Sequence, residues 1–211
     1  MSAVYNKELG AVRFDLQVIA SWIEPGERVL DLGCGNGDLL DYLKTHKQVQ
    51  GTGIEFSEEK AAHCIERGLT VLQGDFRREV TDYPEHRFDV VVLSQTLQQI
   101  QDPRDLLIDL LRIGRRVIVS FPNFGHWSAR LQLLFTGMAP KTDQLPYEWY
   151  NTPNIRVITI KDFNQFLRTI GVRTVRQVAI NTHHHDYRGN IVRLCKNLRA
   201  TYGIMMLARA E

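Results

Sequence analysis

The sequence predicts an α/β fold with a doubly wound, mostly parallel sheet of seven strands that ends in a C-terminal antiparallel hairpin. Two observations predict the parallel part: strand and helix signals alternate from residue 12 to residue 121, and a glycine-rich turn directly follows the first strand. A third distinguishes the end of the chain, where a polar segment joins the last two strand signals; the antiparallel hairpin there is what the family resemblance given below implies. With 211 residues and no internal repeat, the chain fits a single domain, residues 1–211.

Local signals place the elements of the first half. Apolar residues at helical spacing predict a first helix within Val12–Ile23. Ser57 is a favourable N-cap and Gly68 a natural end for a later helix. The apolar run Phe88–Ser94 is typical of a strand buried on both faces. The other strands expected here are Arg28–Leu32, Val49–Glu55 and Thr70–Gln73.

The second half begins with the same alternation and then changes. A long aromatic-rich segment, residues 123–158, interrupts it and is expected to be an insertion or a lid, because loops of this length are usually functional. A terminal pair of strands follows it, joined by a polar segment. The elements expected in this half are a helix over Asp105–Ile113, a strand over Arg116–Phe121, a helix over Ile160–Ile170, and strands over Val172–Ile180 and Tyr202–Arg209.

Composition indicates an ordinary globular protein of the cytoplasm. Apolar residues make up 44% and charged residues 24% of the chain, enough to bury a full core. A net charge of +2 gives no indication of a nucleic-acid partner, and no apolar run approaches the roughly 20 residues of a membrane span. Charged residues within the first 25 positions argue against a signal peptide, and three cysteines without C-x-x-C spacing fit reduced thiols.

The turn Gly33-Cys34-Gly35-Asn36-Gly37 is the strongest functional signal. Glycines between a strand and a helix let a ligand approach backbone N–H groups at the positive end of the helix. Dinucleotide folds use G-x-G-x-x-G spacing, but here Asp38 stands where the third glycine would be and would repel a pyrophosphate. The turn therefore favours a zwitterionic ligand, such as the methionine part of S-adenosylmethionine.

Two acidic residues follow at the ends of the next strands. Glu55 lies about twenty residues beyond the turn, where a carboxylate can accept hydrogen bonds from both ribose hydroxyls. Asp75 follows the third strand and can accept from an adenine amine, with Phe56 or Phe76 against the base. Taken alone, a carboxylate such as Glu55 is more often a solvated strand end, and Asp75 alone could be a turn residue. Because all these groups lie at carboxyl ends of successive strands, we expect one nucleoside site.

Two sets of segments carry a family resemblance. The first resembles the ordered motifs of class I S-adenosylmethionine-dependent methyltransferases, and the second is similar to the methionine biosynthesis family MetW, from about Arg13 to Val178. The first set is Val29–Gly37, Gly53-Ile54-Glu55, Gly74-Asp75 and Phe88–Val91. The second set is Ser94–Gln98, Ser120–Trp127, Arg130–Phe135, Leu145–Tyr150 and Thr152–Ile155.

The resemblance implies a Rossmann-like class I methyltransferase fold and a site for S-adenosylmethionine or S-adenosylhomocysteine. It also implies a role in methionine biosynthesis beside the homoserine O-acyltransferase MetX as partner. In that pattern the glycine turn holds the methionine end of the cofactor, Glu55 the ribose and Asp75 the adenine. The expected cofactor-binding residues are Asp31, Gly33, Cys34, Gly35, Asn36, Gly37, Glu55, Phe56, Asp75, Phe76 and Ser94.

The stretch after the fourth strand lacks a catalytic acid or base. Many small-molecule methyltransferases carry Glu-Val-Leu-Glu-His there, whereas this chain has Gln95-Thr96-Leu97-Gln98-Gln99. Amides and hydroxyls hold a ligand but take no proton near neutral pH. His126 is the candidate base in the aromatic-rich segment. Core packing is the first interpretation for any single aromatic residue there, and a lid or a protein interface are the alternatives.

Two other groups of residues have plain interpretations. The run His183-His184-His185 is expected to be a solvated loop and not a metal site, since adjacent imidazoles alternate in direction. Cys34 is expected to be a small buried thiol and not a reactive group.

Three functions remain in competition. The first is a cofactor-binding partner and regulator of a homoserine O-acyltransferase, since an intact cofactor motif stands beside a neutralised catalytic stretch. The second is an active methyltransferase on a small molecule, because the activated sulfonium needs little more than orientation toward a good nucleophile. The third, NAD-dependent oxidoreduction, is disfavoured by Asp38.

Overall fold

The computed structural model describes residues 12–183 and 186–210 of the chain. Its strands are β1 (Arg28–Leu32), β2 (Gln50–Glu55), β3 (Val71–Gln73), β4 (Phe88–Ser94), β5 (Gly114–Pro122), β6 (Val172–Thr182), β7 (Gly189–Ile191) and β8 (Tyr202–Arg209). They form one sheet in the order β3-β2-β1-β4-β5-β8-β6-β7. The strands from β3 to β5 run parallel, whereas β8 is antiparallel to both β5 and β6. The predicted parallel sheet with a C-terminal antiparallel part is confirmed.

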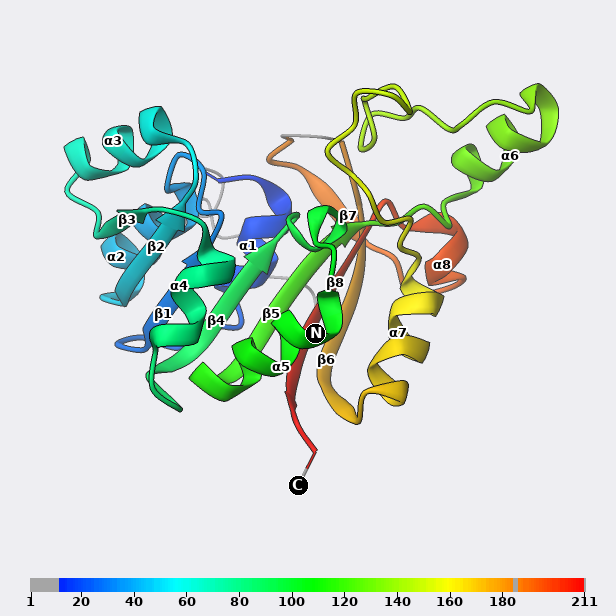
Figure 1. The fold of residues 1–211 in the computed structure, drawn as a ribbon. Coiled ribbons are helices and arrows are strands. Elements are labelled where there is room, and N and C mark those ends of the chain that lie inside the picture. Colours follow the sequence, from blue (N-terminus) through cyan, green and yellow to red (C-terminus); the bar gives the residue numbers. More distant parts are fainter. Residues whose placement is uncertain (1–11, 184–185, 211) are drawn as a thin grey trace.

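Helices cover both faces of this sheet, as Figure 1 shows, with α4, α5 and α7 on the near face and α1 and α2 behind it. A short 3-10 turn, η2, follows β4, and α6 extends away from the end of the sheet. The helices are α1 (Phe14–Ala20), α2 (Asp38–Lys47), α3 (Glu58–Glu66), α4 (Phe76–Asp82), η2 (Leu97–Gln99), α5 (Pro103–Ile113), α6 (Trp127–Thr136), α7 (Ile160–Thr169) and α8 (Lys196–Arg199).

Strand β4 shows why its apolar run is continuous. Val91 and Leu93 belong to the core on the α5 and α7 side, and Val90 and Val92 to the core on the α1 and α2 side. All four side chains have no exposed surface. A central parallel strand with helices on both faces must be apolar at every position. The sheet is thereby held rigid between two cores, and its carboxyl end can position a site.

The structure differs from the prediction by one strand, two α-helices and the short 3-10 helix η2. The sheet has eight strands and not seven, because β7 pairs antiparallel with the end of β6. Every residue of β7 is exposed, so backbone pairing alone forms it and no apolar pattern announces it. The helices α4 and α8 were not expected either; each buries one residue or none. The core strands and helices lie where their patterns predicted.

The aromatic-rich segment holds the helix α6 and a long return to α7. In Figure 1 this part of the chain stands away from the sheet. Within the described parts of the chain, no helix has the length and apolar character needed to cross a bilayer.

Candidate cofactor site

The glycine turn between β1 and α2 takes left-handed backbone at three positions. Gly33, Gly35 and Gly37 have φ angles of 71°, 58° and 78°, a region that other residues rarely adopt. A Cβ on Gly37 would lie 2.5 Å from the Leu69 Cδ1 atom, whereas a Cβ on Gly35 would meet nothing within 4 Å. Gly37 is therefore required for packing, and Gly35 leaves open space for a ligand.

Glu55 fastens this turn to the end of β2. Its Oε2 atom accepts a hydrogen bond from Gly35 N at 2.8 Å, and its Oε1 atom accepts one from Ser57 N at 2.9 Å. The residue is only 9% exposed. Each carboxylate oxygen has a second lone pair, so Glu55 can brace the turn and still accept a hydroxyl hydrogen bond. The structure brings it against the turn, as the spacing of about twenty residues predicted.

A cavity of about 360 Å³ opens at this turn. A volume of this size falls in the range of roughly 300–1,000 Å³ that is typical of small-molecule sites. It lies at the carboxyl ends of β1 and β4 and beside the first helix. Of the predicted residues, Asp31, Gly33, Cys34, Gly35, Asn36 and Ser94 line it.

Asp31 is a buried carboxylic acid of this cavity whose pKa is strongly raised. It is 3% exposed, and burial raises the pKa of its carboxyl to about 7, with the Arg13 cation lowering that pKa and the Glu55 anion raising it. No donor among residues 12–183 and 186–210 hydrogen-bonds to its carboxyl oxygens. A buried carboxylate without a donor is costly, and a ligand ammonium group would supply both donor and charge. Asp31 therefore fits the amino group of a methionine moiety.

The sequence alone did not indicate Arg13, which provides the cavity with a cation. Its Nε and Nη2 atoms donate to the two oxygens of Asp15 at 3.1 and 3.0 Å. Gln95 Nε2 donates to Asp15 Oδ2 at 2.7 Å, which ties the end of β4 to α1. Arg13 and Gln95 both line the cavity, and a guanidinium carries further N–H donors that can bind a carboxylate.

The stretch of amides after β4 is structural in this protein. Gln95 adopts a φ of 52°, and its carbonyl accepts from Gln98 Nε2 at 2.6 Å. The Gln95 amide side chain is occupied by Asp15. A glutamate at position 95 would set two carboxylates against each other. The amide therefore serves to position Arg13 through Asp15, and it places no base in the cavity.

The residues expected at the adenine lie apart from the cavity lining. Asp75 is the N-cap of α4, and its carboxylate binds the guanidinium of Arg77, which lowers the pKa of Asp75. Phe56 is 74% exposed beside Glu55, and Phe76 packs against the core. These positions follow the strand ends as expected, while an adenine contact at each of them remains a prediction.

The remaining residues of the turn have packing roles. The Cys34 side chain lies against Gly53, where an added Cβ would come within 2.6 Å of its Sγ atom. Burial raises the pKa of this thiol, which keeps it protonated and unreactive. Asp38 pairs with Arg67 Nη1 at 3.3 Å, and Arg67 also binds the Asn36 carbonyl. This pairing secures the turn against α3.

His126 caps a helix and does not line the cavity. It is the N-cap of α6, where its Nδ1 atom accepts from Ser128 N at 3.3 Å and lies 2.7 Å from Ser128 Oγ. Burial lowers the pKa of its imidazole. Because a base must reach the proton that it removes, His126 has no catalytic task at the glycine turn in this arrangement.

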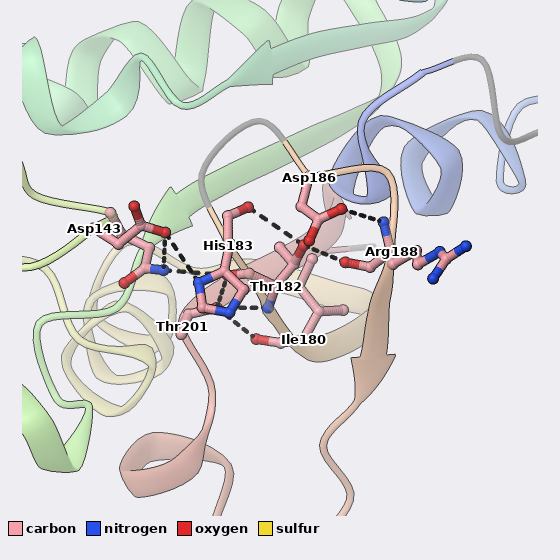
Figure 2. Close-up of polar contacts among 8 residues, drawn as sticks. Asp143, Ile180, Thr182, His183, Asp186, Arg188 and Thr201 are labelled. Atoms are coloured by element: carbon pink, nitrogen blue, oxygen red, sulfur yellow. Dashed lines mark hydrogen bonds and ion pairs between the residues drawn. The ribbon is translucent and has the colours of Figure 1, made fainter.

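The histidine run is only partly described. His183 is exposed, and its Nδ1 atom lies 3.3 Å from Asp143 Oδ2, while His184 and His185 lie outside the described residues. Figure 2 shows the neighbouring hydrogen bonds, in which Thr182 binds Thr201 and the carbonyl of Arg188. Over the described residues, no group of three or more potential metal-binding side chains gathers anywhere.

Comparison with known families decides the relationship. The chain matches the family described as methionine biosynthesis protein MetW over residues 13–207. The chain belongs to the MetW family. It is also 34% identical over 167 residues to a bifunctional methionine biosynthesis protein MetXA/MetW from Rhodopirellula baltica. The aligned residues cover 75% of this chain and 27% of the relative. This MetW chain therefore spans about a quarter of the length of that relative.

Further relatives are methyltransferases by name or by fold. A ubiquinone biosynthesis O-methyltransferase from Hahella chejuensis is 30% identical over an alignment that covers 43% of this chain and 40% of the methyltransferase. A methyltransferase structure from Thermotoga maritima superposes with a TM-score of 0.65 at 18% identity, covering 96% of this chain and 87% of the other. The [4+2]-cyclase SpnF superposes with a TM-score of 0.62 at 16% identity, over 92% and 80% of the chains. The Rossmann-like methyltransferase fold is thus confirmed for this MetW protein.

Proposed function

We propose that this MetW protein binds S-adenosylmethionine or S-adenosylhomocysteine and acts as a partner and regulator of a homoserine O-acyltransferase in methionine biosynthesis. One observation carries the proposal: the cavity at the glycine turn combines a buried acid and a cation, Asp31 and Arg13, while the lining residues at the end of β4, Ser94 and Gln95, carry no ionisable side chain. The two opposite charges of such a site suit the two opposite charges of a zwitterion.

The chemistry of the cavity matches the amino-acid end of the cofactor. The Asp31 carboxylate suits the α-ammonium group, and the Arg13 guanidinium suits the α-carboxylate. Gly35 leaves room for the chain between these groups, and Glu55 stands beside it for the ribose. When bound, the cofactor would supply an activated methyl group, but the residues around it act by holding and orienting.

The partner is suggested by the architecture of a relative. The Rhodopirellula baltica protein carries the names MetXA and MetW in one chain. A fusion keeps two units at a fixed ratio and a high local concentration, which is useful when the two work together. Units that are joined in one relative therefore commonly work together when they are separate proteins. On this basis the acyltransferase is the partner that we propose for the present chain.

The test measures the acyltransferase and not methyl transfer. We expect the activity of the homoserine O-acyltransferase from the same genome to change when this chain is added, and to change again when S-adenosylmethionine is titrated in. The variant Gly35→Asp places a side chain in the open space of the turn and should abolish the cofactor response while retaining binding of the partner. An acyltransferase indifferent to this chain contradicts the proposal.

The second candidate is methyl transfer to a small molecule. It is favoured by the relatives that match over about half of the chain, which are named as methyltransferases. Incubation with S-adenosylmethionine and a metabolite extract distinguishes the two candidates. Accumulation of S-adenosylhomocysteine with the native chain, and not with Gly35→Asp, would support transfer.

A further inference from the structure

Exposed apolar side chains gather in one part of this protein. Of the 20 large apolar residues recorded as exposed among the described residues, 11 lie within residues 127–157, which we call the arm. Leu134, Phe135 and Trp149 are 73%, 78% and 77% exposed. Figure 1 shows the arm standing away from the sheet. Single exposed apolar residues are ordinary, but a concentration of this kind marks an interaction surface.

The helix of the arm is hardly used by the protein's own core. Of the ten residues of α6, only Ala129 is buried, whereas α5 buries five residues of similar type. A helix of this length is marginal in water unless its apolar face packs on something. The apolar side chains of α6 therefore lack the packing partner that helices of this composition normally have.

The arm also encloses a hollow of about 900 Å³. Leu133, Met138 and Trp149 are among its lining residues. Its two sides are joined because Lys141 N donates to Gln132 Oε1 at 2.9 Å and Lys141 Nζ binds Glu148 Oε1 at 2.6 Å. A braced apolar hollow beside an exposed helix can receive a convex apolar element of another protein.

The exposed area is large enough for a stable complex. Aromatic side chains have roughly 150–250 Å² of surface each. At exposed fractions of 50%, 78%, 77% and 71%, roughly 550 Å² is exposed by four aromatic residues alone, Trp127, Phe135, Trp149 and Tyr150. Seven further large apolar side chains of the arm add to this area. One partner of a standard interface contributes roughly 800 Å². The arm therefore provides the area of a complete interface.

We propose that the arm is the docking surface for the homoserine O-acyltransferase subunit, an inference that rests on the proposed function. The fused relative favours this occupant over a second copy, because it joins one unit of each kind in a single chain. The residues of the arm are absent from the lining of the cofactor cavity. Both ligands can therefore be bound at once, as a regulator requires.

The test compares two double variants of the full chain. Leu134→Ser with Phe135→Ser removes two exposed side chains of α6, and Ile65→Ser with Ile108→Ser removes two exposed side chains from other helices, at 56% and 43% exposure. Binding to the acyltransferase is measured by calorimetry, together with the affinity for S-adenosylmethionine. We expect the α6 variant to bind the acyltransferase at least about thirtyfold more weakly, while the control and both cofactor affinities stay within about twofold.

The outcomes separate this inference from the function on which it rests. If the native chain binds the acyltransferase and the α6 variant binds equally well, the surface is wrong and the proposed function stands. If the native chain does not bind at all, the proposed function itself fails. If sedimentation shows that the native chain is a dimer and the α6 variant a monomer with unchanged acyltransferase binding, the arm joins two copies and the inference is overturned.

Discussion

The variant Asp31→Asn removes a buried carboxyl group of the cofactor cavity whose pKa the fold raises strongly. Its carboxyl is 3% exposed, with a pKa raised to about 7 against a usual 3.8. A raised pKa means that the folded protein holds this proton more tightly than the unfolded chain. Its contribution to stability is therefore full below about pH 4 and is lost as the pH rises toward 7. The asparagine side chain does not ionise, so the variant does not lose stability in this way as the pH rises.

The magnitude follows from the shift. Each pKa unit corresponds to about 1.4 kcal/mol, so the free energy of unfolding of Asp31→Asn, relative to the native chain, should rise by about 3 kcal/mol between pH 5 and pH 8. Urea denaturation at both values measures this difference. Asp89→Asn is the matched control. Arg28 holds the pKa of Asp89 below its usual range, so Asp89 is ionised at both pH values. The free energy of unfolding of this variant relative to the native chain should therefore be the same at pH 5 and pH 8.

An unchanged difference for Asp31→Asn at the two pH values would refute the burial argument. The same residue also predicts how the cofactor binds. Because the ammonium group needs an ionised Asp31, the affinity of the native chain for S-adenosylmethionine should fall as the pH drops below about 7. In Asp31→Asn the affinity should be at least about tenfold weaker at pH 8, since a hydrogen bond to a charged group contributes roughly 1.5–3 kcal/mol.

Three further variants test the surroundings of the site. Gln95→Glu sets a second carboxylate against Asp15 and should lower the free energy of unfolding by roughly 2 kcal/mol at pH 8; urea denaturation should show a smaller loss at pH 5, where a shared proton restores the hydrogen bond. Arg13→Lys keeps the charge but loses the planar fork, so calorimetry should show about tenfold weaker binding of S-adenosylmethionine and unchanged binding of methylthioadenosine, which lacks the carboxylate. Leu107→Ala empties a site with no exposed surface and should cost about 2–5 kcal/mol in urea denaturation without changing cofactor affinity.

The relationship between binding and chemistry is visible at the end of β4. Gln95 is joined to Asp15 and helps to hold Arg13. A neutral amide is needed there, because it must donate to a buried carboxylate. At this position the side chain positions Arg13 through Asp15 and takes no proton near neutral pH. This agrees with the proposed function, in which the cofactor is a signal and not a reagent.

The sequence by itself predicted the parallel part of the sheet and the place of the candidate site. The continuous apolar run of β4 reflects burial on both faces, and the glycines at 33, 35 and 37 reflect left-handed backbone. Both patterns come from local requirements. The backbone of the turn requires the glycines, and the helix layers on the two faces of the sheet require the apolar run of β4. Glu55 could be found from spacing alone, because strand ends in a parallel sheet meet at one edge.

Only the tertiary structure decided which side chains contact one another at the carboxyl edge of the sheet and which apolar side chains of the arm stay exposed. The contact between Gln95 and Asp15 joins residues 80 positions apart, and the pKa of Asp31 depends on burial by several elements at once. The strand β7 forms by backbone pairing without any apolar pattern. The α6 side chains are apolar in sequence like those of a core helix, yet they remain exposed because no other element of the described fold packs on them. Pattern indicates which residues prefer burial, whereas the folded chain decides which of them obtain it.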